Sequence, residues 1–69
     1  MKKGTLHTFK GIEEFADIND FEIENLGTNR IGENFLILRH KEKDITLSFC
    51  LLYASGSDYM YECVYSDIK

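Results

Sequence analysis

Residues 34–68 read NFLILRHKEKDITLSFCLLYASGSDYMYECVYSDI, which is three apolar runs separated by two short polar breaks. The runs cover 34–40, 45–54 and 58–67, and all three are rich in the aromatic and β-branched residues that favour strands. The breaks between them leave room for tight turns only, and strands joined so tightly are antiparallel neighbours. This stretch therefore predicts three consecutive strands of an antiparallel meander.

A short helix is expected upstream, over residues 12–19. Gly11 is an acceptable N-cap, and apolar residues recur at helical spacing on one side of the segment while acidic residues take the other. The apolar positions are Ile12, Phe15 and Ala16, and the acidic positions are Glu13, Glu14 and Asp17. The apolar side is then available to cover one face of the meander.

Residues 21–26 (FEIENL) alternate between apolar and polar side chains, which is typical of a strand with one solvent-exposed face. Residues 27–33 hold turn-forming clusters and are expected to be a loop, whereas residues 4–9 (GTLHTF) offer one more short strand. The predicted fold class is α+β: a short N-terminal helix packed on one face of a four-stranded antiparallel β-meander, or a five-stranded one if 4–9 pairs. Residues 1–69 are expected to form a single small domain.

The last turn decides which side chains share a face of the sheet. A two-residue turn at Gly56-Ser57 suits a type II′ geometry and pairs Phe49 with Val64. A three-residue loop that also includes Ser55 shifts the pairing by one residue and turns the tyrosines of the last strand to the opposite face. Turn chemistry favours the first register, and a bulge in the last strand could combine the two.

In the favoured register the second face of the sheet is apolar as well. Leaving its six large side chains in water would forgo about 9–18 kcal/mol, at about 1.5–3 kcal/mol each, which exceeds the net stability expected of so small a domain. Tyrosine is enriched where proteins meet, so we expect a protein partner, or a second copy in a homodimer, to cover this face. In the other register the tyrosines form an aromatic core instead. The expected partner-binding residues are Phe35, Ile37, Leu52, Tyr59, Tyr61 and Tyr65.

Acidic residues are concentrated in residues 11–33, which hold seven of the twelve Asp and Glu residues of the chain. The simplest interpretation is that these residues form the solvent-exposed faces of a helix and of a strand. The same residues would also provide a docking surface for a basic partner. They would equally suit an acidic mimic of nucleic-acid phosphates. The expected acidic docking surface consists of Glu13, Glu14, Asp17, Asp20, Glu22 and Glu24. The net charge of −4 argues against direct binding of nucleic acid.

Motifs and spacing argue against an enzyme. The sequence contains no GxSxG, no P-loop and no histidine paired with an acid at a telling spacing. Cys50 and Cys63 are direct neighbours in the favoured register and are expected to be free, buried thiols, with a cross-strand disulfide as the alternative. His7 and His40 have no metal-ligand spacing with each other or with the cysteines, so no metal or other cofactor is expected. We expect a cytoplasmic protein that binds no membrane, since no signal peptide or membrane-spanning segment is recognisable.

These observations lead to three hypotheses of function. The first is a non-catalytic protein-binding module that acts through an aromatic sheet face and an acidic helix and strand surface. Small, acidic, motif-free cytoplasmic domains are also typical of phage or mobile-element inhibitors of host enzymes, an association that rests on composition alone. The second is a small-ligand-binding domain with an aromatic pocket between sheet and helix, or across a dimer seam. The third is the nucleic-acid mimic, which would block a DNA- or RNA-binding protein.

Overall fold

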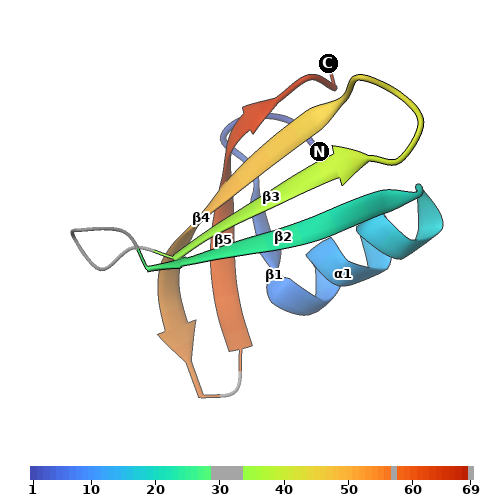
Figure 1. Cartoon of the computed structure of the whole chain (residues 1–69). Coiled ribbons are helices and arrows are strands. Elements are labelled where there is room, and N and C mark those ends of the chain that lie inside the picture. The colour runs from blue at the N-terminus through green and yellow to red at the C-terminus, as the bar shows by residue number, and fades with distance from the viewer. Residues whose placement is uncertain (29–33, 57, 69) are drawn as a thin grey trace.

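A computed structural model describes residues 1–28, 34–56 and 58–68 of the chain. A short strand, β1 (Leu6–Thr8), leads directly into a helix, α1 (Phe9–Ile18). Four longer strands follow, namely β2 (Phe21–Thr28), β3 (Asn34–His40), β4 (Thr46–Ser55) and β5 (Asp58–Ser66). They form one five-stranded antiparallel sheet in the order β1-β5-β4-β3-β2 (Figure 1). The α+β fold class is thus confirmed, and the segment 4–9 does supply a fifth strand.

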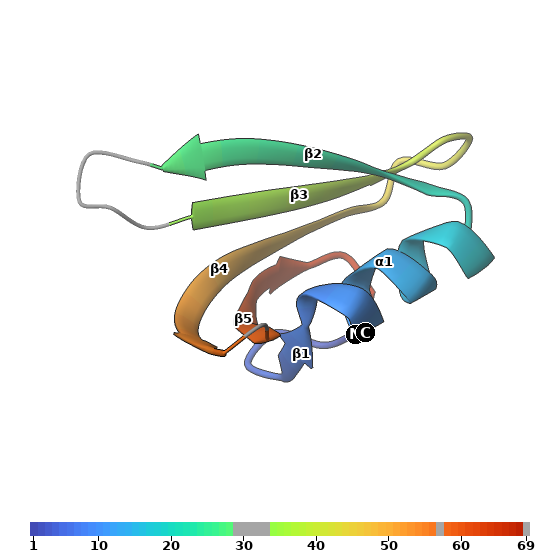
Figure 2. The ribbon, with the colours of Figure 1, turned by 90° about the horizontal axis from the view of Figure 1, so that it is seen from below.

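The sheet curls around the helix. Figure 2 shows α1 on the concave side of the sheet, while none of the described residues forms a helix on the convex side. α1 contacts β1 and β5 at one end of the strand order and β2 at the other. The helix therefore crosses the open side of the curved sheet and covers its concave face. No other described element covers the convex face.

The helix begins three residues earlier than the sequence predicted. Thr8, not Gly11, is the N-cap: its backbone is extended, and its hydroxyl Oγ1 accepts a hydrogen bond from the N–H of Gly11 at 3.1 Å. At the other end the N–H of Asn19 donates to the carbonyl of Phe15 at 3.0 Å. Asp20 follows with a φ of +61°, a left-handed conformation that aspartate tolerates better than most residues.

The hydrophobic core fills the space between α1 and the concave face. It contains Ile12 and Ala16 of the helix, as predicted, and Phe15 stacks on the edge of the core against Phe21 at a ring separation of 5.4 Å. β3 pairs with β4 in a register that places Leu36 opposite Phe49. The buried residues are Ile12, Ala16, Phe21, Leu36, Leu38, Leu47, Phe49, Tyr61 and Cys63.

The loop expected at 27–33 begins later than predicted. Gly27 and Thr28 extend β2 and pair with Phe35 and Asn34 of β3, after a bulge at Leu26. The rest of the expected loop, 29–33, lies outside the described residues.

The pairing of β4 with β5 combines the two registers considered above. Near the turn, Tyr53 lies opposite Met60, as a two-residue turn at Gly56-Ser57 predicts, and Gly56 has a φ of +61°. In the middle of the pair, Phe49 lies opposite Cys63, so the predicted Phe49–Val64 pair is wrong.

Two bulges on opposite strands produce this shift and then reverse it. Leu52 is the extra residue of β4, and Val64 is the extra residue of β5. Between the bulges Tyr61 and Cys63 turn into the core, where their burial compensates for the irregular pairing. Beyond the second bulge Tyr65 pairs with Ser48, which is again the register set by the turn.

Candidate interaction surfaces

The structure divides the predicted aromatic surface between the two faces of the sheet. Phe35, Ile37 and Tyr65 lie on the convex face. Phe35 and Ile37 alternate along β3 with the buried Leu36 and Leu38. Tyr65 pairs with Ser48, which itself alternates with buried residues of β4. Tyr61 is on the concave side and only 5% exposed, so its placement on the second face was wrong. Tyr59, two residues earlier on the same strand, points to the same side as Tyr61.

A strip of mainly apolar side chains, interrupted by Ser48 and Glu62, crosses the convex face from strand to strand, and we call it the convex strip. One row of paired residues runs Phe35, Cys50, Glu62 and Leu6, and the next runs Ile37, Ser48 and Tyr65. The side chains of Leu6 and Tyr65 are 52% and 50% exposed. The sequence did not predict Leu6 as a surface residue of the sheet, because the strand expected at 4–9 had not been assigned a neighbouring strand.

Tyr65 is held at the surface by a short hydrogen-bond chain. Its hydroxyl donates to Oδ1 of Asp67, whose Oδ2 accepts from the backbone N–H of Thr46 at 2.9 Å. The hydrogen bond to Asp67 and the charge of that carboxylate raise the pKa of Tyr65, whereas the two donors lower the pKa of Asp67. This hydrogen bond holds the ring of Tyr65 in one orientation, and the Tyr65 hydroxyl stays protonated at neutral pH.

Charged side chains border the convex strip along β2 and β3. Glu24 forms an ion pair with Arg39, the one salt bridge among the described residues. Glu22 lies opposite Arg39 in the β2–β3 register. Both glutamates were assigned to the acidic docking surface, but they lie on the face of the sheet away from α1, so this predicted surface is split in two.

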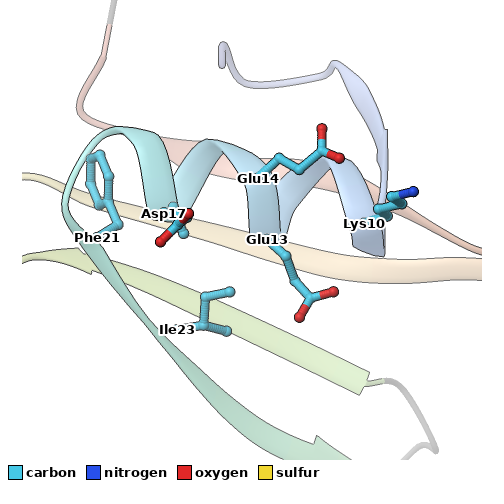
Figure 3. A pocket seen from close by; sticks show the side chains of 7 residues that line it. Lys10, Glu13, Glu14, Asp17, Phe21 and Ile23 are labelled. Atoms are coloured by element: carbon cyan, nitrogen blue, oxygen red, sulfur yellow. The ribbon is translucent and has the colours of Figure 1, made fainter.

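Three of the remaining four acids, Glu13, Glu14 and Asp17, line a groove between α1 and β2. The groove has a volume of about 590 Å³, and its floor is formed by apolar side chains that include Phe21 and Ile23. Figure 3 shows Glu13 and Asp17 reaching from the helix along this groove toward β2. Asp20 is exposed at the turn between helix and strand and does not line the groove. The alternation around Ile23 in the sequence would have identified it as the residue facing the helix.

A second, smaller hollow lies at the N-terminal end of α1, and we call it the aromatic hollow. Its volume is about 310 Å³, and the rings of Phe9 and Tyr61 lie 6.2 Å apart in it. The lining residues are Phe9, Asn25, Asn34, Tyr59 and Tyr61. Sequence reasoning missed Phe9, because it placed the start of the helix after this residue.

The two cysteines form no disulfide with each other and lie on opposite faces of the sheet. Cys50 is opposite Glu62 on the convex face, whereas Cys63 is fully buried on the concave face, so the predicted direct pairing of the two is wrong. Burial raises the pKa of the Cys63 thiol, which disfavours the reactive thiolate. Leu52, another of the predicted partner-binding residues, is the extra residue of the β4 bulge and is 47% exposed.

Both histidines have structural contacts. Nε2 of His7 lies 2.7 Å from Oγ1 of Thr5, and its ring meets Phe49 edge-on at 6.1 Å. Nδ1 of His40 accepts hydrogen bonds from the backbone N–H groups of Glu42 and Lys43, both at 3.0 Å, and so stabilises the turn after β3. Among the described residues no three His, Cys, Asp or Glu side chains are grouped so that they could hold a metal ion.

Comparison with known proteins adds no relative to this description. No family model matches the chain, and neither the curated proteins nor the solved structures gave a significant match. Within the described part of the chain, α1 is too short and too polar to cross a membrane.

Proposed function

We propose that this chain is a non-catalytic protein-binding module whose convex strip is the binding surface. The observation that supports this proposal is the exposure of Leu6 and Tyr65 in a strip that no other described element covers. Apolar side chains bordered by charges, here Glu24 and Arg39, are typical of a protein interface. Large exposed apolar patches are uncommon on small monomeric proteins unless they bind something.

A second copy of the chain is the partner we propose first. A twofold-symmetric interface must be complementary to itself, and the border of the convex strip carries both signs of charge, in Arg39 and in Glu22 and Glu24. Inhibition of a host enzyme by a phage or mobile-element protein is a more specific form of the same proposal. It draws on the small size and acidity of the chain.

Light scattering at micromolar concentration tests the homodimer. The wild type should have twice the mass of one chain, and Leu6→Glu or Ile37→Glu should give a monomer, because each replaces an apolar side chain of the strip by a charge. Ile18→Glu is the matched control, since Ile18 is 78% exposed on the helix, away from the sheet. A wild type that stays monomeric would contradict the homodimer, and a dimer unaffected by either strip variant would contradict the convex strip as its interface.

The aromatic hollow favours a second candidate function, the binding of a small ligand. Its volume of about 310 Å³ is at the lower end of small-molecule sites, about 300–1,000 Å³, and it combines rings with the amides of Asn25 and Asn34. A flat compound with a hydrogen-bonding edge would suit it. Screening such compounds by the rise in melting temperature tests this function. Tyr59→Ala should abolish the rise, whereas Tyr65→Ala, on the convex face, should not.

A further inference from the structure

The strand β2 is one of the two edges of the sheet. Within the described part of the chain its one strand partner is β3, so its second side has no strand beside it. The opposite edge, β1, is only three residues long, whereas β2 has eight. An exposed edge strand of this length is a template for pairing with another extended chain. The groove between α1 and β2 adjoins this template.

The groove is negatively charged. Glu13, Glu14 and Asp17 line it together with a single basic residue, Lys10 (Figure 3). All four side chains are exposed, and none belongs to the one ion pair of the described residues. Glu22 and Glu24, on the other face of β2, add to the negative potential along the same strand. A peptide segment that paired with the edge of β2 would thus have carboxylates near both faces of the sheet.

We propose that β2 and the adjoining groove bind an extended, basic segment of a partner protein by β-strand addition. Backbone hydrogen bonds to the edge of β2 would hold the segment, and the aliphatic stems of its groove-facing basic side chains would pack on Phe21 and Ile23. Successive side chains of an extended segment point to opposite faces, so lysine or arginine at every second position would face the groove. Their ammonium or guanidinium groups would reach Glu13 and Asp17, and the apolar side chains between them would lie on the other face of the sheet. This site is separate from the convex strip and does not depend on the function proposed for it.

Charge also argues against a second copy of the chain at this edge. Pairing two β2 strands side by side would bring two sets of carboxylates together, and like charges placed across a strand pair are destabilising. A basic partner turns the same carboxylates into attractive contacts, and long-range attraction would speed its association. The acidic groove therefore selects a partner of opposite charge.

A synthetic peptide that alternates lysine with valine is a suitable probe, with backbone amide shifts in the NMR spectrum as the readout. Shifts should concentrate at β2 and the groove-facing side of α1, around Ile23 and Glu13. A peptide of the same sequence with N-methylated backbone amides keeps its charge but cannot extend a sheet, so it should not bind. A peptide with glutamate in place of lysine should not bind either.

Variants of the chain test how much the charges of the groove contribute to peptide binding. Glu13→Gln combined with Asp17→Asn should weaken binding about two- to thirtyfold and reduce its salt dependence, because two exposed charge contacts are lost. Glu42→Gln, in the turn after β3, is the matched control and should leave the affinity unchanged. Ile37→Gln, on the convex strip, adds no charge beside β2 and should also leave the affinity unchanged, whatever the outcome for the homodimer.

Three results would overturn the proposal. Equal binding of the N-methylated peptide would mean that charge alone attracts it. Shifts confined to Phe35, Ile37 and Tyr65 would place the peptide on the convex strip. No binding of the lysine–valine peptide at low salt, with amide exchange along β2 slowed at high protein concentration, would mean that the edge pairs with a second copy.

Discussion

Phe49 and Cys63 lie directly opposite each other on β4 and β5, and neither side chain is accessible to solvent. This pair exists because the bulge at Val64 shifts the register by one residue. The shift turns Tyr61 into the core as well and leaves Glu62 on the convex face, next to Cys50. One extra residue thus converts an apolar face into a mixed one and completes the core on the other side.

Replacing Phe49 should severely destabilise the fold. Phe49→Ala should lower the free energy of unfolding by about 3–5 kcal/mol, because it removes a fully buried ring at the centre of the sheet. This loss is a large part of the total stability of about 5–15 kcal/mol typical of such domains. Urea denaturation measures it, with Tyr53→Ala as the control, since Tyr53 is 54% exposed and its loss should cost less than about 1 kcal/mol. Equal midpoints for both variants would contradict the core position of Phe49.

The two thiols should differ in reactivity. Cys50 is half-buried on the convex face, whereas Cys63 is fully buried and has a raised pKa. We expect a thiol reagent to modify one cysteine quickly in the native protein and both after denaturation. Cys50→Ser should remove the fast reaction, and Cys63→Ser should leave it. A native protein in which neither thiol reacts, and both appear only after reduction, would indicate a disulfide.

The N-cap of α1 should have a measurable effect on stability. Thr8→Ala removes the acceptor of the Gly11 N–H and should lower the free energy of unfolding by about 0.5–2 kcal/mol. Thr8→Ser keeps the hydroxyl and should recover most of this loss. Thermal denaturation of the three proteins tests the expectation. If serine and alanine destabilise equally, the methyl group rather than the hydroxyl of Thr8 carries the effect.

Stability should fall as the pH decreases below about 6.5, through His7. Burial, and then the positive charge of the chain N-terminus, lower the pKa of His7 from its ordinary value of 6.5. The folded state therefore binds fewer protons here than the unfolded state, so this contribution is complete above pH 6.5 and is lost as the pH falls through the folded pKa. His7→Gln should flatten the pH dependence of the melting temperature in this window.

Asp67→Asn provides the control for the pH experiment. The pKa of Asp67 is lowered from 3.8, so the contribution of Asp67 is present above pH 3.8 and is lost only at lower pH. This variant should alter the acid end of the curve and leave the region near pH 6.5 unchanged. A flattening near pH 6.5 in the Asp67 variant, and not in the His7 variant, would contradict the assignment to His7.

Local patterns were sufficient to predict most of the fold. Short polar breaks predicted the β3–β4 and β4–β5 hairpins, and the spacing of Ile12 and Ala16 predicted the buried side of the helix. The start of the helix was missed because two candidate caps, Thr8 and Gly11, lie within one turn. Both satisfy local rules, and the extended backbone of β1 selects Thr8.

The division of side chains between the two faces required knowledge that local patterns do not hold. The turn at Gly56-Ser57 predicted the register next to it, but the bulges at Leu52 and Val64 depend on how Tyr61 and Cys63 pack against the distant helix. The acidic residues were a single cluster in sequence, yet strand alternation sends Glu22 and Glu24 away from α1. The edge position of β2 follows from the whole strand order and not from its own residues.

The paired bulges also explain how so short a chain encloses a core. A bulge bends its strand and increases the local twist, and β4 curves strongly in Figure 2 as the sheet wraps toward α1. Removing Leu52 and Val64 together would restore regular pairing but would straighten the sheet. A straighter sheet would open its concave side to water, and a single ten-residue helix would be too small to close it. In this protein the curvature of the sheet takes the place of a second helix.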